Sequence, residues 1–129
     1  MAEAAPTLSA GEWPGDPAPP LAQVLLDRYD DSRDRPFIAF ENGESFDYGQ
    51  AVGRAASIAQ ALREAGLAPG DRVLLALDNC PAFIDAWFGC ALGGFVMVPL
   101  NTLLSGRLLE DVVKRSAPRA VVAQEPYAA

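Results

Sequence analysis

The glycines near the middle of the chain are the residues whose spacing could bind a phosphate. The segment FGCALGGFVMVPLN, residues 88–101, places Gly89, Gly93 and Gly94 just before an apolar run. A phosphate loop needs glycines after a strand and before a helix, where free N–H groups meet the anion. Here the glycines follow an expected helix and precede an expected strand, so that helix end carries a partial negative charge. We therefore interpret Gly89 as a close-packing position and Gly93 or Gly94 as a left-handed helix cap.

Three consecutive polar positions before this segment, and one lysine after it, are further candidates for chemistry. Asp78 and Asn79 follow the apolar run at 72–77, at the carboxyl end of an expected parallel strand, where α/β folds bind ligands. Asn79 also fits a residue next to a helix cap. Cys80 lies near a helix N-terminus, which can lower a thiol pKa, but the chain has no histidine to act as its base. The only lysine, Lys114, fits a solvated position on a helix.

Other polar and aromatic residues favour structural roles. Asp71 and Arg72 indicate the polar start of a strand rather than a charge pair in a site, and Asn101 is suited to pin the following loop by hydrogen bonds. Three aromatic residues at helical spacing favour a core position over an acyl pocket: Phe83, Trp87 and Phe88. We therefore assign no residue of this chain as catalytic, cofactor-binding or metal-binding.

Composition limits the classes of partner. The chain has 129 residues, a formal net charge of -7 and 50% hydrophobic residues, as expected for one globular domain. The negative charge disfavours nucleic acids and anionic membranes as partners, and no apolar run approaches the roughly 20 residues of a transmembrane helix. The N-terminus lacks the features of a signal peptide. Cys80 and Cys90 lie in apolar surroundings, which favours reduced thiols and a cytoplasmic location.

The chain divides into an arm and a folded part. Residues 1–20 are rich in proline and predict a flexible arm, whereas residues 21–129 carry periodic apolar positions. A short amphipathic helix is predicted from the spacing of Leu21, Val24, Leu25 and Tyr29. Asn42-Gly43, between residues 37–41 and 44–47, predicts a hairpin.

A helix, capped at both ends, should follow the hairpin. Asp47 and Gln50 form a capping box at its start, and Gly66 ends it in the left-handed conformation, with Leu67 folding back onto the last turn.

The rest of the chain predicts alternating strands and helices. We expect adjacent parallel strands, with the three later helices as crossovers, at Arg72–Leu77, Phe95–Leu100 and Arg119–Ala123. In the helix over 82–91, Asp85 should face away from the core. Ser105 should cap the last helix, whose inward stripe is Leu108, Leu109, Val112 and Val113. The predicted fold class is α/β: an N-terminal helix and β-hairpin followed by αβαβαβ, part of a doubly wound parallel sheet.

Several marks together resemble one enzyme family. They are the turn GLAPGDRV at 66–73, Asn79-x-Pro81, Val98-Pro99-Leu100-Asn101 and NTLLSG at 101–106 followed by two leucines. Over residues 21–125 the chain resembles the N-terminal subdomain of AMP-forming acyl-CoA synthetases. These belong to the adenylate-forming superfamily, together with luciferases and peptide-synthetase adenylation domains. The last mark is most similar to the branch of crotonobetaine/carnitine-CoA ligases.

The resemblance implies a two-step reaction in the full-length enzyme. A carboxylate attacks the α-phosphate of ATP to give an acyl-adenylate and pyrophosphate, and the thiolate of coenzyme A then displaces AMP. ATP, Mg²⁺ and coenzyme A are the implied cofactors, and a carboxylic acid is the implied substrate. The family's phosphate loop, its adenine and ribose motifs and its catalytic lysine have no counterpart in this sequence. We therefore expect the chain to be inactive alone, to bind none of these cofactors, and to partner the remainder of a ligase or a complementary subunit.

Two alternatives stay open at this stage. The chain could be a standalone, non-catalytic interaction module that pairs with another chain, or a small α/β domain that binds a ligand at the carboxyl ends of its strands. The coding sequence beyond Ala129 would separate a ligase fragment from a module. We also predict that the isolated chain associates or is partly molten, because exposed strand edges and apolar faces recruit other chains.

Overall fold

The computed structural model describes residues 20–125 and residue 127. The arm predicted over 1–20 therefore lies outside the described residues, apart from Pro20. The elements, in chain order, are α1 (Leu21–Ser32), β1 (Pro36–Ala39), β2 (Ser45–Asp47), α2 (Tyr48–Glu64), β3 (Arg72–Ala76), α3 (Pro81–Gly93), β4 (Val96–Pro99), α4 (Gly106–Ser116) and β5 (Ala120–Ala123).

The three later strands form one parallel sheet in the order β4-β3-β5. Val73 of the central strand pairs with Met97 on one side and with Ala120 on the other. The prediction of adjacent parallel strands is confirmed, with ends shifted by one or two residues. Pro99 fits its place because β4 is an edge strand among the described residues, where a missing N–H leaves no ladder bond unmade.

Only two of the later helices are crossovers within this sheet. α3 joins β3 to β4, and α4 joins β4 to β5. The expected crossover role of α2 is wrong, because the preceding strand, β2, pairs with β1 in a separate antiparallel sheet. α2 instead connects the hairpin to the parallel sheet.

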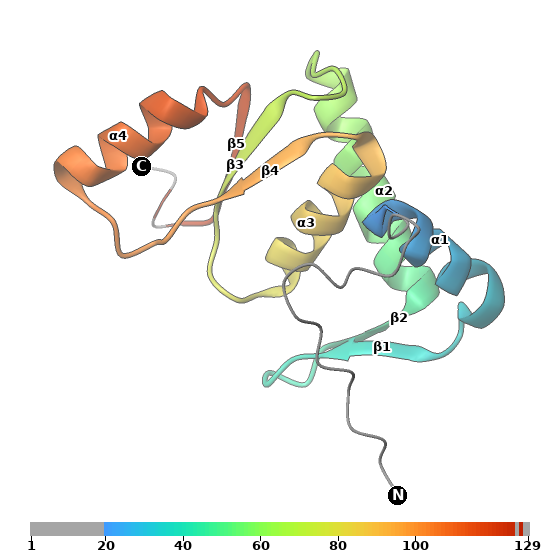
Figure 1. The fold of residues 1–129 in the computed structure, drawn as a ribbon. Coiled ribbons are helices and arrows are strands. Elements are labelled where there is room, and N and C mark those ends of the chain that lie inside the picture. Colours follow the sequence, from blue (N-terminus) through green and yellow to red (C-terminus); the bar gives the residue numbers. More distant parts are fainter. Residues whose placement is uncertain (1–19, 126, 128–129) are drawn as a thin grey trace, which may run out of the picture.

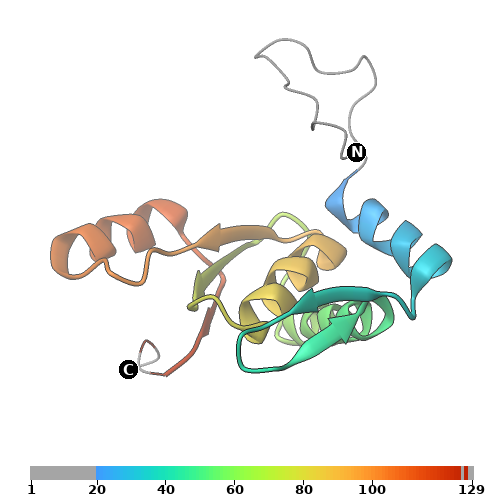
Figure 2. The same cartoon turned by 90° about the horizontal axis from the view of Figure 1, so that it is seen from below.

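The helices form layers on the two faces of the parallel sheet. Figure 1 shows α2 and α3 together on one side of the strands and α4 on the other, with α1 and the hairpin beyond α2 and α3. The view from below in Figure 2 again separates α4 from the other helices. Alternate residues of β3 follow this division, since Val73 and Leu75 belong to the core under α2 and α3, whereas Leu74 and Ala76 border the hollow under α4.

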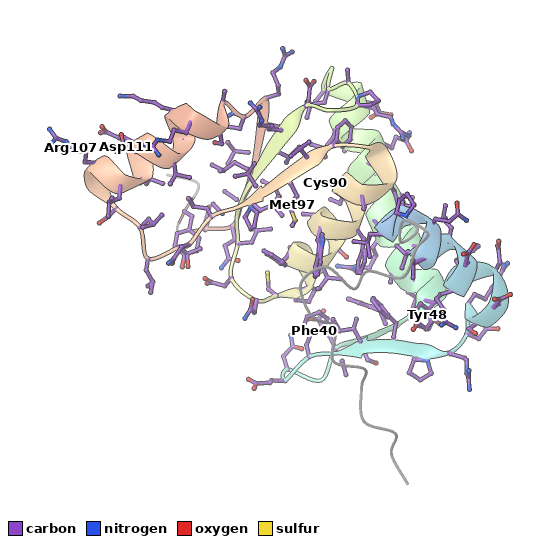
Figure 3. All side chains as sticks on the ribbon, in the orientation of Figure 1. Phe40, Tyr48, Cys90, Met97, Arg107 and Asp111 are labelled. Carbon is purple, nitrogen blue, oxygen red and sulfur yellow. The ribbon has the colours of Figure 1, made fainter. Side chains whose placement is uncertain are left out.

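The core under α2 and α3 is well filled. Val73 and Leu75 are fully buried there, together with Leu62, Leu67, Leu77, Ala86, Cys90 and Phe95. Figure 3 shows Cys90 and Met97 lying between α3 and the strands. A second cluster joins α1, α2 and α3 through Leu25, Val52, Ala55 and Phe88.

The layer made by α4 is much more open. None of its residues is buried, and Leu108 is 64% exposed. The prediction of an inward apolar stripe on α4 is therefore wrong, because no residue of the stripe is buried. Leu109 and Val113 border a hollow of about 370 Å³ against the sheet, and Leu108 faces solvent. Ser105 does hold the N-cap position, although its side chain makes no capping hydrogen bond.

The local signals around α2 are confirmed. The Asp47 carboxylate accepts a hydrogen bond from the N–H of Gln50 at 2.7 Å, and the Gln50 side chain accepts one from the N–H of Asp47 at 3.0 Å. Gly66 adopts φ 96°, and the N–H of Leu67 donates to the carbonyl of Leu62 at 3.1 Å. This helix is fixed at both ends by its own sequence.

Candidate functional site

The glycines of the central segment have the packing roles that their order indicates. A Cβ atom on Gly89 would lie 2.7 Å from the Ile58 side chain, so the glycine allows α2 and α3 to approach closely. Gly94 adopts φ 75° and caps α3 in the left-handed conformation. Gly93 lies against the ring of Phe95. These glycines therefore serve helix packing and capping, and they do not form a phosphate loop.

Asp78 lies at the centre of a polar network at the carboxyl end of β3. Its carboxylate accepts hydrogen bonds from the Thr102 hydroxyl at 3.2 Å, the Gln124 amide at 2.9 Å and the Tyr127 hydroxyl at 3.1 Å. Its N–H donates to the Gln124 side chain at 3.0 Å. These partners follow β4 and β5, so one carboxylate ties together the carboxyl ends of all three strands. Both carboxylate oxygens accept from the chain itself, which identifies Asp78 as a structural anchor.

A hollow of about 530 Å³ lies beside this network, between the hairpin turn and the start of α3. Asn79 and Cys80 line it, together with Ala39, Phe40, Glu41, Asn42 and Pro81. The Cys80 thiol lies 3.5 Å from the Gln124 amide oxygen, and Cys80 occupies the N-cap of α3 without a side-chain capping bond. The lining offers a carboxylate, amides and one thiol. No hydrogen bond joins the Glu41 carboxylate to the Cys80 thiol, which bonds to Gln124 instead, and the lining holds no cation for an anion.

The other polar candidates also have structural roles. The Asp71 carboxylate accepts from the N–H of Ala68 at 2.8 Å, and the Arg72 guanidinium donates to the carbonyl of Ser116 at 3.2 Å. Each thus bonds elsewhere in the chain, as expected for the polar start of a strand. The side chain of Asn101 accepts from the N–H of Leu103 at 3.0 Å, so it pins the loop that follows β4. Lys114 is exposed on α4.

One polar residue was placed on the wrong face of its helix. Asp85, expected to face away from the core, is buried, and its two carboxylate oxygens bind the guanidinium of Arg54 on α2 at 2.9 and 2.7 Å. These hydrogen bonds raise the pKa of Arg54, more than desolvation lowers it. Arg54 also lies over the ring of Phe46, 4.3 Å from its centroid. The pair joins α3, α2 and the hairpin. The one sequence feature that could have indicated it is a single carboxylate within an otherwise apolar helix.

The three aromatic residues of α3 divide between core and surface. Phe88 is buried and Phe83 packs against the core, as predicted. Trp87 is 38% exposed, so its assignment to the core is wrong. The helix turns its ring outward, where it stacks on Phe88 with centroids 5.4 Å apart.

Within residues 20–125 and 127, the strand ends do not fit a nucleotide. A phosphate there would meet the Asp78 carboxylate, and the arginines Arg72 and Arg119 lie at the opposite ends of their strands. In the same residues, no three side chains of metal-ligating type come together. No helix among the described residues combines the length and the apolar character needed to cross a bilayer.

The fold and these strand ends define one part of a doubly wound α/β domain, and residues 20–125 and 127 contain no anion-binding loop of a nucleotide site. The sequence model of the family described as AMP-binding enzyme matches residues 26–129. The chain belongs to this family, as its sequence marks indicated. The crotonobetaine/carnitine–CoA ligase of Salmonella paratyphi A is 41% identical over 114 residues, covering 83% of this chain and 22% of the ligase. The ligase of Salmonella typhimurium is 41% identical over 101 residues, covering 73% and 19%. The chain thus spans about a fifth of the length of these curated relatives.

Solved structures agree with this assignment of fold. A benzoate CoA ligase from Burkholderia xenovorans is 30% identical, with a TM-score of 0.76, over 83% of this chain and 22% of that enzyme. VinN, solved with 3-methylaspartate, has a TM-score of 0.78 at 24% identity, over 84% of this chain and 30% of that one. The predicted fold class, part of an adenylate-forming enzyme's N-terminal domain, is confirmed.

Proposed function

We propose that this chain is the N-terminal part of an ATP-dependent acid–thiol ligase that forms an acyl-adenylate and then an acyl-CoA. Its family membership and its 41% identity to crotonobetaine/carnitine–CoA ligase support this activity for the complete enzyme. ATP, Mg²⁺, coenzyme A and a carboxylic acid are then its reactants and cofactors. The two free cysteines, Cys80 and Cys90, are consistent with a reducing cytoplasm, where we place the enzyme.

The role of this segment is to build and brace the sheet, and alone it carries out no adenylation. The Asp78 network carries this proposal. It fills the strand ends with bonds inside the chain, and among the residues that the structure describes no basic side chain joins Asp78, Asn79 or Cys80 to stabilise phosphate charge. The partner of the segment is the remainder of the ligase, on the same chain or on a complementary subunit.

Exchange of pyrophosphate into ATP tests the proposal. The purified chain should give no carboxylate-dependent exchange above a blank without enzyme, and any such exchange would contradict the proposed inactivity. A chimaera in which residues 26–129 replace the matching segment of a crotonobetaine/carnitine–CoA ligase should retain exchange. The same chimaera with Leu75→Asp should lose it, because Leu75 is fully buried in the core. A chimaera that folds but never exchanges would argue against the ligase assignment.

A non-catalytic module that binds another chain is the second candidate. The open layer of α4 and the exposed Val121 of β5 favour it. A separately encoded, abundant protein of this length would support the module, whereas an in-frame continuation that encodes a phosphate loop would support the ligase. The third possibility, a small ligand-binding domain, is disfavoured because Asp78 already bonds within the chain.

A further inference from the structure

The two outer strands of the parallel sheet differ in how well their free edges are protected. Natural sheets protect an edge with proline or charged side chains, because free N–H and C=O groups otherwise pair with another chain. In β4, Val96 and Leu100 donate their N–H groups to the carbonyls of Asp71 and Leu75 at 2.9 and 2.8 Å. Since successive residues of a strand alternate in direction, Pro99 faces the free edge, where it offers no N–H.

The free edge of β5 has no protection of this kind. The strand reads AVVA, with neither a proline nor a charged side chain, and it has no second partner strand among the described residues. Val121, in the middle of the strand, is 56% exposed and lines the open hollow under α4. Its neighbours Ala120 and Val122 pack against the filled core on the other face. Backbone groups available for pairing and an exposed valine therefore lie together on β5.

We propose that the free edge of β5 pairs antiparallel with the same edge of a second copy of this chain, about a two-fold axis at Val121. In this register Val121 lies opposite Val121 of the second copy, and Ala120 lies opposite Val122. The two exposed valines then cover each other. The two three-stranded sheets become one continuous sheet, in which β5 no longer has a free edge.

The charges at the two ends of β5 favour this direction of pairing. Arg119 lies opposite Ala123 of the second copy, and Glu125 comes two positions beyond it. Diagonal neighbours of this kind are about 7–8 Å apart, within reach of long side chains. Arg119 and Glu125 are both exposed, and the two-fold axis forms the opposite-charge pair twice. A parallel pairing would instead place Arg119 beside Arg119, and like charges at this position repel each other.

The paired edge is short, with four strand residues from each copy. An interface of this size forms reversibly, so the dimer population should rise with protein concentration. Pairing requires only the 129-residue chain and does not depend on the ligase assignment. A strand supplied by the remainder of a ligase would compete for the same edge.

Disulfide trapping tests the register directly. The variant Val121→Cys is made together with Cys80→Ala, so that the half-buried native thiol does not react. Residues opposite each other in an antiparallel pair have Cβ atoms about 4.5–5.5 Å apart, close to the roughly 3.5–4.5 Å of a disulfide. Val96→Cys in the same background is the matched control, because Val96 is 48% exposed on the other outer strand. At micromolar protein under mild oxidation, Val121→Cys should give at least about tenfold more covalent dimer than Val96→Cys, since pairing raises the effective thiol concentration.

Sedimentation without any crosslink provides an independent measurement. Val121→Lys places a charge on the free edge and should shift the chain to monomer at a concentration where the parent chain is a dimer. Val96→Lys should leave the dimer intact, and circular dichroism shows that both variants keep the fold. Equal crosslinking of Val121→Cys and Val96→Cys would overturn the proposal. Association that survives Val121→Lys but is lost with Leu108→Ser would also overturn it, because the α4 face would then be the contact.

Discussion

The two faces of the parallel sheet differ in how completely they are covered. Under α2 and α3, Val73 and Leu75 have no exposed surface, and the helices approach closely enough to require Gly89. Under α4, Val121 is 56% exposed and a hollow of about 370 Å³ remains. Both helix layers have apolar residues at helical spacing. An apolar stripe therefore predicts which side of a helix faces the sheet. The stripe is buried only where enough neighbouring elements surround the helix.

The largest expected difference between the faces comes from truncating one side chain on each. Leu75→Ala should lower the free energy of unfolding by about 2–5 kcal/mol, because it leaves a cavity in a filled core. Val121→Ala, on the open face, should change it by less than about 0.5 kcal/mol. Urea unfolding followed by circular dichroism, at low protein concentration, measures both. Equal losses at the two positions would show that the faces are equally packed.

The free energy of unfolding should also depend on pH, because a thiol is buried on the filled face. Burial raises the pKa of the Cys90 thiol from 9.0 to about 11. The folded state then holds this proton more tightly than the unfolded state. The contribution of the thiol to the free energy of unfolding is therefore complete below pH 9 and is lost as the pH rises to 11. The loss at pH 11 is about 2–3 kcal/mol, at roughly 1.4 kcal/mol for each pKa unit.

Cysteine variants isolate this contribution from other groups that titrate in the same range. Cys90→Ala should remove the additional loss of stability between pH 9 and 11, whereas Cys80→Ala, which changes the half-buried thiol, should retain it. An identical pH dependence in both variants would contradict the assignment to Cys90.

The smallest of these effects concerns the contact between α2 and α3. Gly89→Ala should destabilise the chain by about 1–3 kcal/mol, because the new Cβ would meet the Ile58 side chain at 2.7 Å and the Ala55 carbonyl at 3.0 Å. Gly53→Ala, also within a helix, has open space around the new Cβ and should stabilise the chain by about 0.5–1 kcal/mol. Thermal unfolding of the two variants should therefore shift in opposite directions. A stabilising Gly89→Ala would show that the helices have room to separate.

Features that depend on neighbours in the sequence could be predicted. The capping box of Asp47 and Gln50, the left-handed Gly66 and the hairpin turn at Asn42-Gly43 each involve residues only a few positions apart. The order of the glycines in α3 also sufficed to reject a phosphate loop, because helix polarity is a local property.

Features that depend on residues far apart in the sequence could not be predicted. Asp85 and Arg54 are 31 positions apart, and Asp78 and Tyr127 are 49 apart, so no periodicity connects them. Whether the stripe on α4 would be covered depended on the number of layers in the fold, and Trp87 lies at the edge of an apolar helix face, where spacing does not separate core from surface. The candidate site was anticipated at Asp78 by topology, but its role as an anchor follows from three partners that only the fold brings together.

The behaviour of the purified 129-residue chain in solution tests the central claim most directly, namely that this chain is one part of a larger ligase domain. The open α4 face and the unpaired edges of β4 and β5 among the described residues should cause association and bind a hydrophobic dye. Sedimentation should therefore show species larger than a monomer, with dye fluorescence that decreases when Leu108→Ser and Val121→Ser are introduced together. A monodisperse monomer that binds no dye would contradict this account and favour the standalone module.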